Sequence, residues 1–394
     1  MTTTNKKHVL DILKRCFPKA DSVKIVQDTL EDGDLHFTSN INRFTVEYEQ
    51  DGKCQQKHVV IKVPISGDTY AFFESFNCFS REVSLYEVVL PKMAKYLDKS
   101  LAPAHLHTTE SKTLVLEDVT ALGYESGEKL PLLNFNQTKG VLKALALFHA
   151  ASHKLHEEDP HFLENLLFSH IAGIEFRKNI INSWEPVVLE LLRRKNETSL
   201  VPRVKAAIDF LKRDDDEIRA LINQSKFKFV VLNHGDSRKD NLLLKHGSNN
   251  QVEGVQFIDF QTSLWSSPLL DIFYFLATSV SIDVIEAHYD DLIDGYLYEL
   301  NEKLKKLDCS SSYERADLDK DFEHLRFFLL ASVLCLCCVI NPMDHAQKKE
   351  TFSQSEVDVD RLYDLCLNDD TFVHAVYGWL KYCDKCNVFE GYTE

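Results

Sequence analysis

A short β-hairpin with a polar loop in front of it interrupts a long series of predicted helices, and this break most constrains the fold. The loop, residues 234–241, has the sequence HGDSRKDN. The apolar segments 242–244 and 255–258 follow it and are separated by turn residues, as the two strands of a hairpin are. Asp259 comes directly after the second strand. Because a hairpin returns the chain on itself, we expect the polar groups of the loop to lie near Asp259.

Two acids and an amide at this spacing suit phosphoryl transfer. Asp236 can orient and deprotonate a nucleophile, while Asn241 and Asp259 can hold Mg²⁺, which prefers hard oxygen ligands. Asp and Asn are also common turn residues, so any one of them alone would more often be turn chemistry. The combination around a hairpin favours the functional interpretation. It predicts a kinase that uses ATP and Mg²⁺, with residues 234–241 as its catalytic loop.

A kinase also needs a lysine for the nucleotide phosphates, and Lys62 is the candidate. It lies at the end of the predicted strand 58–63, from which its ammonium group can reach a cleft. A lysine at a strand end is by itself usually a solvated charge, and only the downstream motif makes ATP binding the better interpretation. The expected partner is a helix glutamate, either Glu82 or Glu87. We prefer Glu82 because it opens the apolar face of that helix.

The rest of the pattern predicts an α+β, bilobal fold of the protein-kinase type. Residues 1–118 are expected to form a β-rich, nucleotide-binding N-terminal lobe, and residues 119–394 a mostly helical C-terminal lobe with the catalytic loop and the acceptor site. The hinge is expected within residues 117–133, where backbone groups of Glu117 and Val119 would bond an adenine edge. The predicted strands are 23–26, 44–48, 58–63 and 113–116, and the predicted helices are 8–17, 79–97, 141–149, 162–174, 180–192 and 204–222.

A glycine-rich phosphate loop is missing in its usual form. Gly33 is the single glycine of the segment 32–40, where the Ser39 hydroxyl and backbone N–H groups could bond phosphate oxygens instead. The motifs GxxxxGK[ST] and GxGxxG are both absent from the sequence, which disfavours P-loop and Rossmann nucleotide-binding folds.

Charge and composition exclude several other classes. The net charge of −16 disfavours a nucleic-acid or anionic-membrane surface. The longest apolar run, residues 327–340, is shorter than the roughly 20 residues that span a bilayer, so we expect a buried helix and no membrane span. The N-terminus lacks an apolar signal segment, which predicts a cytoplasmic protein. Cys383 and Cys386 form a CxxC motif, without two further ligands that a zinc site would need.

Five short motifs of the sequence occur together in one family. They are Val60-Ile61-Lys62, Leu116-Glu117-Asp118, Ala146-Leu147-Phe148-His149-Ala150, His234-Gly235-Asp236 with Asn241, and Ile258-Asp259-Phe260-Gln261. Over roughly residues 20–300 the chain resembles the ecdysteroid-kinase-like family, also called CHK-kinase-like, within the choline-kinase and aminoglycoside-phosphotransferase superfamily. Gln261, where protein kinases have glycine, and the acid of Pro268-Leu269-Leu270-Asp271 are the most discriminating residues.

The resemblance implies ATP- and Mg²⁺-dependent phosphorylation of a hydroxyl group on a small molecule. Asp236 would be the base, Asn241 and Asp259 the metal ligands, and Lys62 the residue on the nucleotide phosphates. Asp271 resembles the structural acid that bonds the catalytic loop, and His234 would support the same loop. The His-Arg-Asp and Asp-Phe-Gly motifs of protein kinases do not occur at these positions, so we expect no protein substrate.

The acceptor is expected to be an ecdysteroid-like or other lipophilic alcohol, with Trp265, Phe327 and Phe328 available to line its pocket. One alternative is a choline-like or aminoglycoside-like cation, which an acidic surface would attract. Another is a pseudokinase that binds a ligand without turnover. The charged segment 237–240 differs from the aromatic-bearing stretch expected in the family, and we expect it beside the acceptor.

Overall fold

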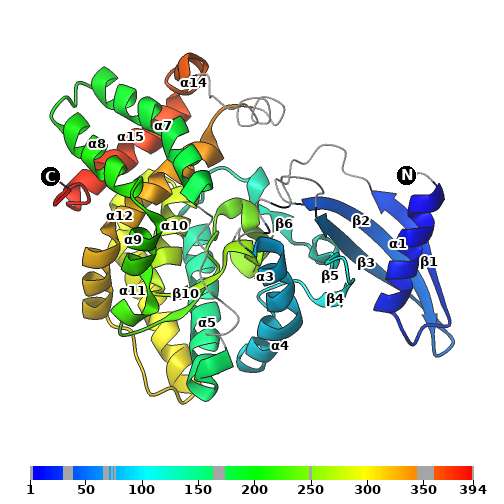
Figure 1. Ribbon diagram of the computed structural model, residues 1–394. Helices are drawn as coiled ribbons and strands as arrows, with labels where there is room; N and C mark the ends of the chain where they lie inside the picture. The colour runs from blue at the N-terminus through cyan, green and yellow to red at the C-terminus, as the bar shows by residue number, and fades with distance from the viewer. Residues whose placement is uncertain are drawn as a thin grey trace.

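A five-stranded antiparallel sheet and a larger group of helices form the two lobes of the fold (Figure 1). The computed structural model describes residues 3–29, 39–64, 71, 74, 77–162, 174–247, 251–343 and 359–392. The strand order is β1-β2-β3-β5-β4, and every neighbouring pair is antiparallel. The bilobal α+β fold predicted from the sequence is thus confirmed. The strands are β1 (Ser22–Thr29), β2 (Ser39–Gln50), β3 (Lys53–Pro64), β4 (His105–Thr108) and β5 (Leu114–Glu117).

Strands β2 and β3 form a hairpin with twelve residues on each side. They are longer than the segments 44–48 and 58–63 predicted from the sequence, because their outer halves are polar and show no apolar alternation. The turn consists of Asp51 and Gly52, with φ of 52° and 68°. Two consecutive positive φ values are typical of the type I′ turn, whose twist matches that of the strands. The hairpin therefore carries Lys62 at a fixed register, opposite Ile41.

Helix α1 (Thr3–Cys16) covers one face of this sheet (Figure 1). Val46 and Val59, on adjacent strands, are fully buried and belong to the same small core as Ile12 and Leu13 of the helix. Alternation of apolar and polar residues along the strands gives the sheet this buried face. The first lobe thus has a core of its own, separate from that of the helices.

The helical segment predicted over residues 79–97 is present, but its winding is not uniform. It consists of α3 (Cys78–Ser84), the π-helical turn η1 (Leu85–Val89), α4 (Leu90–Met93) and the 3₁₀ turn η2 (Ala94–Tyr96). Within the π turn, the Leu90 N–H donates to the carbonyl of Leu85. Pro91 follows and has no N–H to bond the carbonyl four residues earlier, so regular α-helical bonding cannot continue here. Leu85, Tyr86 and Val89 pack into the core of the helical lobe.

The chain leaves the sheet at Glu117 and crosses to the second lobe through a linker, residues 118–134. The linker contains η3 (Val119–Leu122), β6 (Glu125–Ser126) and η4 (Gly127–Lys129), and helix α5 (Phe135–Glu158) follows it. Asp118 caps η3 by accepting from the Thr120 N–H at 3.1 Å, and it also accepts from Arg43 Nη1 of β2 at 2.9 Å. The start of the linker is therefore fixed to the sheet.

Helices make up most of the second lobe. The predicted helix 204–222 is in fact two helices, because Asp214 starts a new one by accepting from the Asp216 N–H at 3.0 Å. The predicted helix 162–174 falls largely on residues outside the described part of the chain. Besides α5, the helices are α7 (Ile174–Arg194), α8 (Leu200–Leu211), α9 (Asp215–Ile222), α10 (Leu269–Ser279), α11 (Ile282–Lys306), α12 (Arg315–Ile340), α14 (Val359–Cys366) and α15 (Asp370–Lys385).

Helix α12 contains the long apolar run noted in the sequence. With 26 residues it is long and apolar enough to cross a membrane by length and composition, and it is the one described helix with this property. Half of its most apolar window is buried inside the protein, and the helix contacts α10, α15 and α7. Leu329, Leu330 and Val333 are almost completely buried. In Figure 1 it lies beside α10 and α15 in the second lobe.

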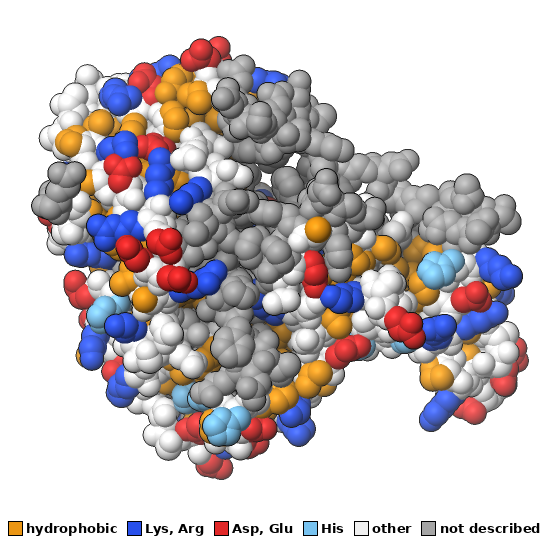
Figure 2. Space-filling view, viewed as in Figure 1, with side chains coloured by type: hydrophobic (Ala, Val, Ile, Leu, Met, Phe, Trp, Pro, Cys, Tyr) orange, Lys and Arg blue, Asp and Glu red, His pale blue; other side chains and the backbone are white. Residues whose placement is uncertain are grey.

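Two small sheets lie beside the helices and carry the polar motifs. β7 (Val231–Asn233) pairs with β10 (Leu264–Ser266), and β8 (Leu242–His246) pairs with both β6 and β9 (Val252–Phe257). The hairpin predicted around the polar loop is confirmed as β8–β9, while part of its turn, residues 248–250, lies outside the described residues. Figure 2 shows Lys and Arg side chains interspersed with Asp and Glu over both lobes on one face of the molecule.

Candidate active site

Lys62 joins three elements from different parts of the chain. Its Nζ lies 2.9 and 2.7 Å from the two carboxylate oxygens of Glu82 on α3, and 3.0 Å from Oδ1 of Asp259 after β9. The side chains of Lys62 and Glu82 are 7% and 1% exposed, and that of Asp259 is 33% exposed. Glu87, the other candidate partner, is exposed. The geometry thus selects Glu82.

The charges of Lys62, Glu82 and Asp259 shift the pKa values of their neighbours in this cluster. Burial alone would lower the pKa of Lys62, but the negative charges of Asp259 and Glu82 raise it above its ordinary value. Burial would raise the pKa of Asp259, yet Lys62 holds it below its ordinary value. The pKa of Glu82 is raised, mainly by burial and also by the charge of Asp259. Lys62 therefore stays protonated. The positive charge of Lys62 in turn keeps the Asp259 carboxylate ionised.

Gln261 connects the helix that carries Glu82 to the segment after the hairpin. Its Nε2 lies 3.2 Å from Glu82 Oε2, and its carbonyl oxygen accepts from Arg81 Nη1 at 2.6 Å. All three side chains are at least nine-tenths buried. These contacts fix the glutamate on α3 relative to the strand β9 that precedes Asp259.

Two backbone positions near the site have positive φ. Asp259 has φ 66° and ψ 65°, in the left-handed region that Asp and Asn tolerate better than most residues. Gly235 has φ 83°, and a Cβ there would lie 2.2 Å from the carbonyl oxygen of Thr262. Glycine is required at 235 because the catalytic loop passes this close to the segment after Asp259.

Asp236 is held by neighbours on both carboxylate oxygens. Asn241 Nδ2 donates to Oδ2 at 2.8 Å and to the Asp236 carbonyl at 2.9 Å, while the Tyr274 hydroxyl donates to Oδ1 at 2.6 Å. The carbonyl of Asn241 accepts from the N–H of Ile258, the residue before Asp259, at 3.0 Å. The loop and the end of the hairpin are therefore adjacent, as the sequence predicts.

Asp271 and His234 shape the loop from behind. Asp271 is fully buried and accepts from the backbone N–H groups of His234 and Gly235 at 2.6 and 2.9 Å. His234 is fully buried as well, and its Nε2 lies 3.0 Å from the carbonyl oxygen of Ile258. Both residues therefore order the loop from the buried interior of the lobe.

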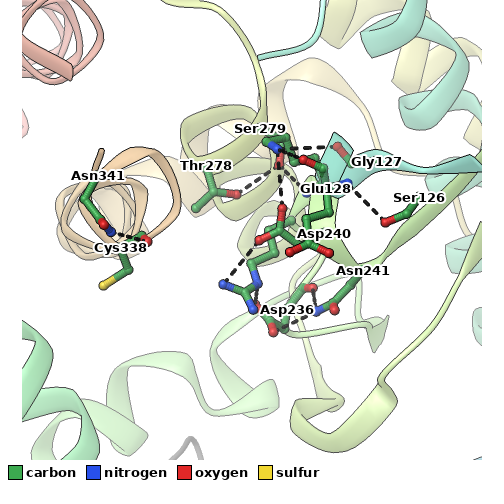
Figure 3. Close-up of polar contacts among 12 residues, drawn as sticks. Ser126, Gly127, Glu128, Asp236, Asp240, Asn241, Thr278, Ser279, Cys338 and Asn341 are labelled. Atoms are coloured by element: carbon green, nitrogen blue, oxygen red, sulfur yellow. Dashed lines mark hydrogen bonds and ion pairs between the residues drawn. The ribbon is translucent and has the colours of Figure 1, made fainter. Parts of the chain in front are cut away.

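The charged segment 237–240 divides into two parts. Ser237 is fully buried and donates to the Asp271 carbonyl at 3.2 Å. Lys239 is 8% exposed and donates to three linker carbonyls, those of Gly127, Glu128 and Leu130, at 3.4, 3.1 and 2.9 Å. These two side chains face inward, and the place of the segment beside the acceptor stays a prediction. Figure 3 shows Asp236 joined to Asn241, and the linker residues Gly127 and Glu128 at the other end of the same group of polar residues.

The oxygen donors present fit a hard divalent cation such as Mg²⁺. Asn241 turns its amide nitrogen to Asp236, so its amide oxygen points away from that residue. Asp259 contacts Lys62 through Oδ1, and Oδ2 is the oxygen that a metal could take. Among the described residues no group of three His, Cys, Asp or Glu side chains could hold a metal ion by itself. One amide, one carboxylate and nucleotide phosphates are the ligand set that Mg²⁺ commonly uses.

The other predicted nucleotide contacts lie on β2 and at the linker. Ser39 is 2% exposed at the start of β2, and Gly33 lies outside the described residues. The Glu117 N–H donates to Ala104 O at 2.9 Å, and the Val119 carbonyl accepts from the N–H groups of residues 123 and 124. An adenine edge would therefore have to bond the Glu117 carbonyl and the Val119 N–H. The Glu117 side chain pairs with Lys57 instead.

Tyr274 is the site residue that the sequence did not reveal. It lies on α10 three residues after Asp271, so one face of that helix presents both side chains to the catalytic loop. An aromatic residue in an apolar helix gives no signal of this role. Trp265 and Phe327, considered for the acceptor pocket, are 6% and 4% exposed within the core, so they belong to the packing of the lobe.

A lysine–glutamate pair between a strand and a helix, an aspartate after a hairpin and an acid held by an amide define a kinase-like phosphotransferase. The sequence model of the ecdysteroid kinase-like family matches residues 33–309. The chain belongs to this family, and the resemblance noted in the sequence is confirmed. A comparison with curated proteins gave no match.

The solved structures that match this chain have low sequence identity to it. The GDP complex of wild-type aminoglycoside 2'-phosphotransferase-IIIa is 14% identical, with 97% of this chain and 99% of that chain covered and a TM-score of 0.43. An ethanolamine kinase of Plasmodium vivax is 14% identical, with 93% and 83% covered and a TM-score of 0.38. A thermostable aminoglycoside phosphotransferase APH(4)-Ia, in complex with ADP and hygromycin B, is 11% identical, with 97% and 99% covered and a TM-score of 0.31.

Proposed function

We propose that the protein is an ATP- and Mg²⁺-dependent phosphotransferase that phosphorylates a hydroxyl group of a small molecule. The observation that carries this proposal is the double pairing of Lys62, with Glu82 at 2.7 Å and Asp259 at 3.0 Å. This pairing joins the sheet, helix α3 and the end of the hairpin in one charged cluster. A lysine held in this way is positioned for nucleotide phosphates, and the aspartate beside it for the metal ion.

Asp236 is the residue that we assign to the acceptor hydroxyl. A bond forms between the acceptor oxygen and the γ-phosphorus, and the bond from that phosphorus to the oxygen bridging the β-phosphate breaks. The acceptor proton passes to the Asp236 carboxylate, and ADP and the phosphorylated alcohol leave. Asn241 keeps the carboxylate in position through its 2.8 Å hydrogen bond.

Turnover is tested by ATP consumption with the wild-type chain and an Asp236→Ala variant. We expect the variant to be slower by about 10²–10⁴-fold, the usual contribution of a general base and its positioning. Asp294→Ala, at an exposed site on α11, is the matched control and should keep the wild-type rate. Equal rates for the wild type and the Asp236 variant would sink the assignment of Asp236.

Metal and nucleotide binding can be measured without turnover. Mg²⁺ would neutralise charge on the phosphates when it is bound, with Asn241 and Asp259 as its protein ligands. ATP at 100 times its Kd with Mg²⁺ should raise the free energy of unfolding by about 2.7 kcal/mol, and EDTA should remove most of this gain. Lys62→Met should abolish the gain, whereas Lys143→Met, at an exposed site on α5, should keep it. A thermal-shift titration measures both, and an EDTA-insensitive gain would contradict the metal assignment.

For the acceptor we propose an ecdysteroid-like or other lipophilic alcohol over a choline-like or aminoglycoside-like cation. The Arg238 guanidinium lies 3.6 Å from Asp236 Oδ1 and would repel a cationic acceptor from the base. Phosphorylation assays with a steroid alcohol, choline and an aminoglycoside compare the classes. Preferential turnover of choline or the aminoglycoside would overturn this choice.

One observation supports a second candidate, a pseudokinase. Both carboxylate oxygens of Asp236 are engaged, by Tyr274 at 2.6 Å and Asn241 at 2.8 Å, so an acceptor hydroxyl must share or displace one of these bonds. A Tyr274→Phe variant frees Oδ1. Nucleotide binding without ATP consumption, in both the wild type and this variant, would favour the pseudokinase.

A further inference from the structure

Arg238 is a partly buried cation that makes no side-chain hydrogen bond to another described residue. Its side chain is 30% exposed, and its charge is balanced by ion pairs from Nε to Asp236 Oδ1 at 3.6 Å and from Nη1 to Asp240 Oδ2 at 3.7 Å. Both distances exceed the range of a hydrogen bond to a carboxylate. The Nε atom is completely buried and has no hydrogen-bond partner among the described residues.

The neighbouring Lys239 shows how the same loop treats a cation that has only a structural role. Its ammonium donates to three linker carbonyls at 2.9 to 3.4 Å, and its side chain is 9% exposed. A guanidinium carries five N–H donors in a planar fork, and leaving a buried one such as the Nε–H unbonded is costly. Protein carbonyls therefore bond the Lys239 ammonium, whereas the Arg238 guanidinium keeps donors that a ligand can bond.

The surroundings of Arg238 indicate where this ligand lies. The guanidinium Nε lies 3.6 Å from Oδ1 of Asp236, the oxygen that also accepts a hydrogen bond from the Tyr274 hydroxyl. It therefore lies beside the group that would take the acceptor proton. An anion bound there would lie next to the acceptor oxygen from which Asp236 takes the proton.

We propose that Arg238 binds an oxyanion at the point of transfer, namely the phosphoryl group that passes from ATP to the acceptor. This inference rests on the proposed function and adds a residue to it. The planar fork of arginine can bond two phosphoryl oxygens at once. While the bond to the bridging oxygen of ADP breaks and the bond to the acceptor oxygen forms, the guanidinium stabilises the negative charge on the group in transit.

An oxyanion at Arg238 could also come from a second source, an anionic substituent on the acceptor. The two sources differ when no acceptor is present, because water then takes the phosphoryl group, its proton passes to Asp236, and ADP and phosphate are the products. A residue that binds the phosphoryl group affects this hydrolysis. A residue that binds only the acceptor's anion leaves it unchanged and raises the KM of an anionic alcohol alone.

The experiment measures acceptor-free ATP hydrolysis for the wild type, Arg238→Ala, Arg238→Lys and, as the control, Arg193→Ala at an exposed site on α7. We expect Arg238→Ala to lower the hydrolysis rate by about 10²–10³-fold with little change in the Kd for ADP. Arg238→Lys should recover part of the rate, and the control all of it. Hydrolysis by Arg238→Ala within threefold of wild type overturns the phosphoryl assignment. If the KM of a carboxylate- or sulfate-bearing alcohol then rises at least tenfold, the acceptor's anion is the ligand.

A second measurement keeps this inference separate from the proposed function. Inorganic phosphate is titrated into each variant, and the melting temperature is followed. Phosphate should stabilise the wild type and Arg193→Ala but not Arg238→Ala, whether or not the chain hydrolyses ATP. Equal stabilisation of all variants would show that no oxyanion site exists at Arg238. A wild type that binds phosphate through Arg238 but neither binds nor consumes ATP would reject the proposed function and retain the anion site.

Discussion

A single buried carboxylate, that of Asp271, sets the backbone of the catalytic loop. It accepts the N–H groups of His234 and Gly235 at 2.6 and 2.9 Å, and His149 Nε2 lies 3.2 Å from the same side chain. Burial alone would raise the pKa of Asp271, but the hydrogen bond from His149 and the loop N–H groups hold it below its ordinary value. The ionised form is therefore the one that orders the loop around Asp236.

Replacing this acid by its amide tests the role of the charge. In Asp271→Asn an NH₂ group faces a backbone N–H, so a buried donor loses its acceptor, and we expect the free energy of unfolding to fall by on the order of 3 kcal/mol. ATP consumption should fall as well, because the loop loses its support. Urea denaturation measures the first effect, with the exposed Asp294→Asn as control. Wild-type stability of Asp271→Asn would show that the carboxylate is dispensable.

The sequence identifies the residues whose spacing is dictated by the chemistry and misses those that reach the site through packing. Lys62, Glu82 and Asp259 could be paired from a strand, a helix and a hairpin, and the structure brings them together. Tyr274 could not be found, since its contact with Asp236 depends on how α10 lies against the loop. The inward turn of Lys239 was hidden for the same reason, because its partners are backbone carbonyls, which have no signature in a sequence.

Among the elements, the catalytic loop and the linker are fitted to each other. A Cβ at Gly127 would lie 2.2 Å from the carbonyl oxygen of Lys239, so only glycine allows the two segments to approach this closely. The buried Lys239 ammonium then donates to the linker carbonyls of Gly127, Glu128 and Leu130. This contact therefore ties the linker between the lobes to the loop that carries Asp236.

Lys239→Met removes the ammonium and keeps a side chain of similar length. Three carbonyls lose a charged donor, and we expect the free energy of unfolding to fall by about 2 kcal/mol. The kcat for ATP should decrease more than the KM for ATP changes, because this side chain faces the linker and not the nucleotide. Lys143→Met is the matched control on α5. A variant with unchanged stability and kcat would show that the contact does not position the loop.

The predicted boundaries of helices and strands differ from the structure where polar residues form caps or strands. The sequence pattern runs through residues 204–222 as one helix because apolar positions stay periodic on both sides of 212–214. Asp214 nevertheless ends this continuity as the cap of α9. The polar outer halves of β2 and β3 are strands because each pairs with the other, which is a tertiary effect that apolar alternation does not report.

For the molecule as a whole, buried histidines link stability to pH. His149 is fully buried, with its two ring nitrogens 3.2 Å from Asp271 Oδ2 and 2.7 Å from the Tyr296 hydroxyl. His153 is 6% exposed, stacks on Phe229 and lies 2.9 Å from the Val230 carbonyl. Burial lowers the pKa of both imidazoles, although Asp271 for one and the Val230 carbonyl for the other act in the opposite direction.

The sign of the pH dependence follows from these shifts. A histidine titrates near pH 6.5 in the unfolded chain and lower in the folded one, so below about pH 6.5 the unfolded state binds more protons and stability falls. Each such group should contribute a slope of up to about 1.4 kcal/mol per pH unit between its two pKa values. Chemical denaturation from pH 7.5 to 5 measures the slope. His149→Gln should reduce it, the exposed His374→Gln should not, and equal slopes for all three proteins would contradict the argument.

The π-helical turn between α3 and α4 decides how two ends of one helix face their partners. Glu82, before this turn, forms an ion pair with Lys62, and Met93, after it, is fully buried in the core of the second lobe. In a uniform α-helix each residue is rotated by about 100° around the axis from the one before it. With the same number of residues, a uniform helix would therefore turn either Glu82 or Met93 away from its partners. The wider turn absorbs one residue without rotating its flanks. Loss of a single exposed residue from this turn, such as Val88, would therefore leave both ends in register, and the length of this helix can vary by one residue while its two faces stay fixed.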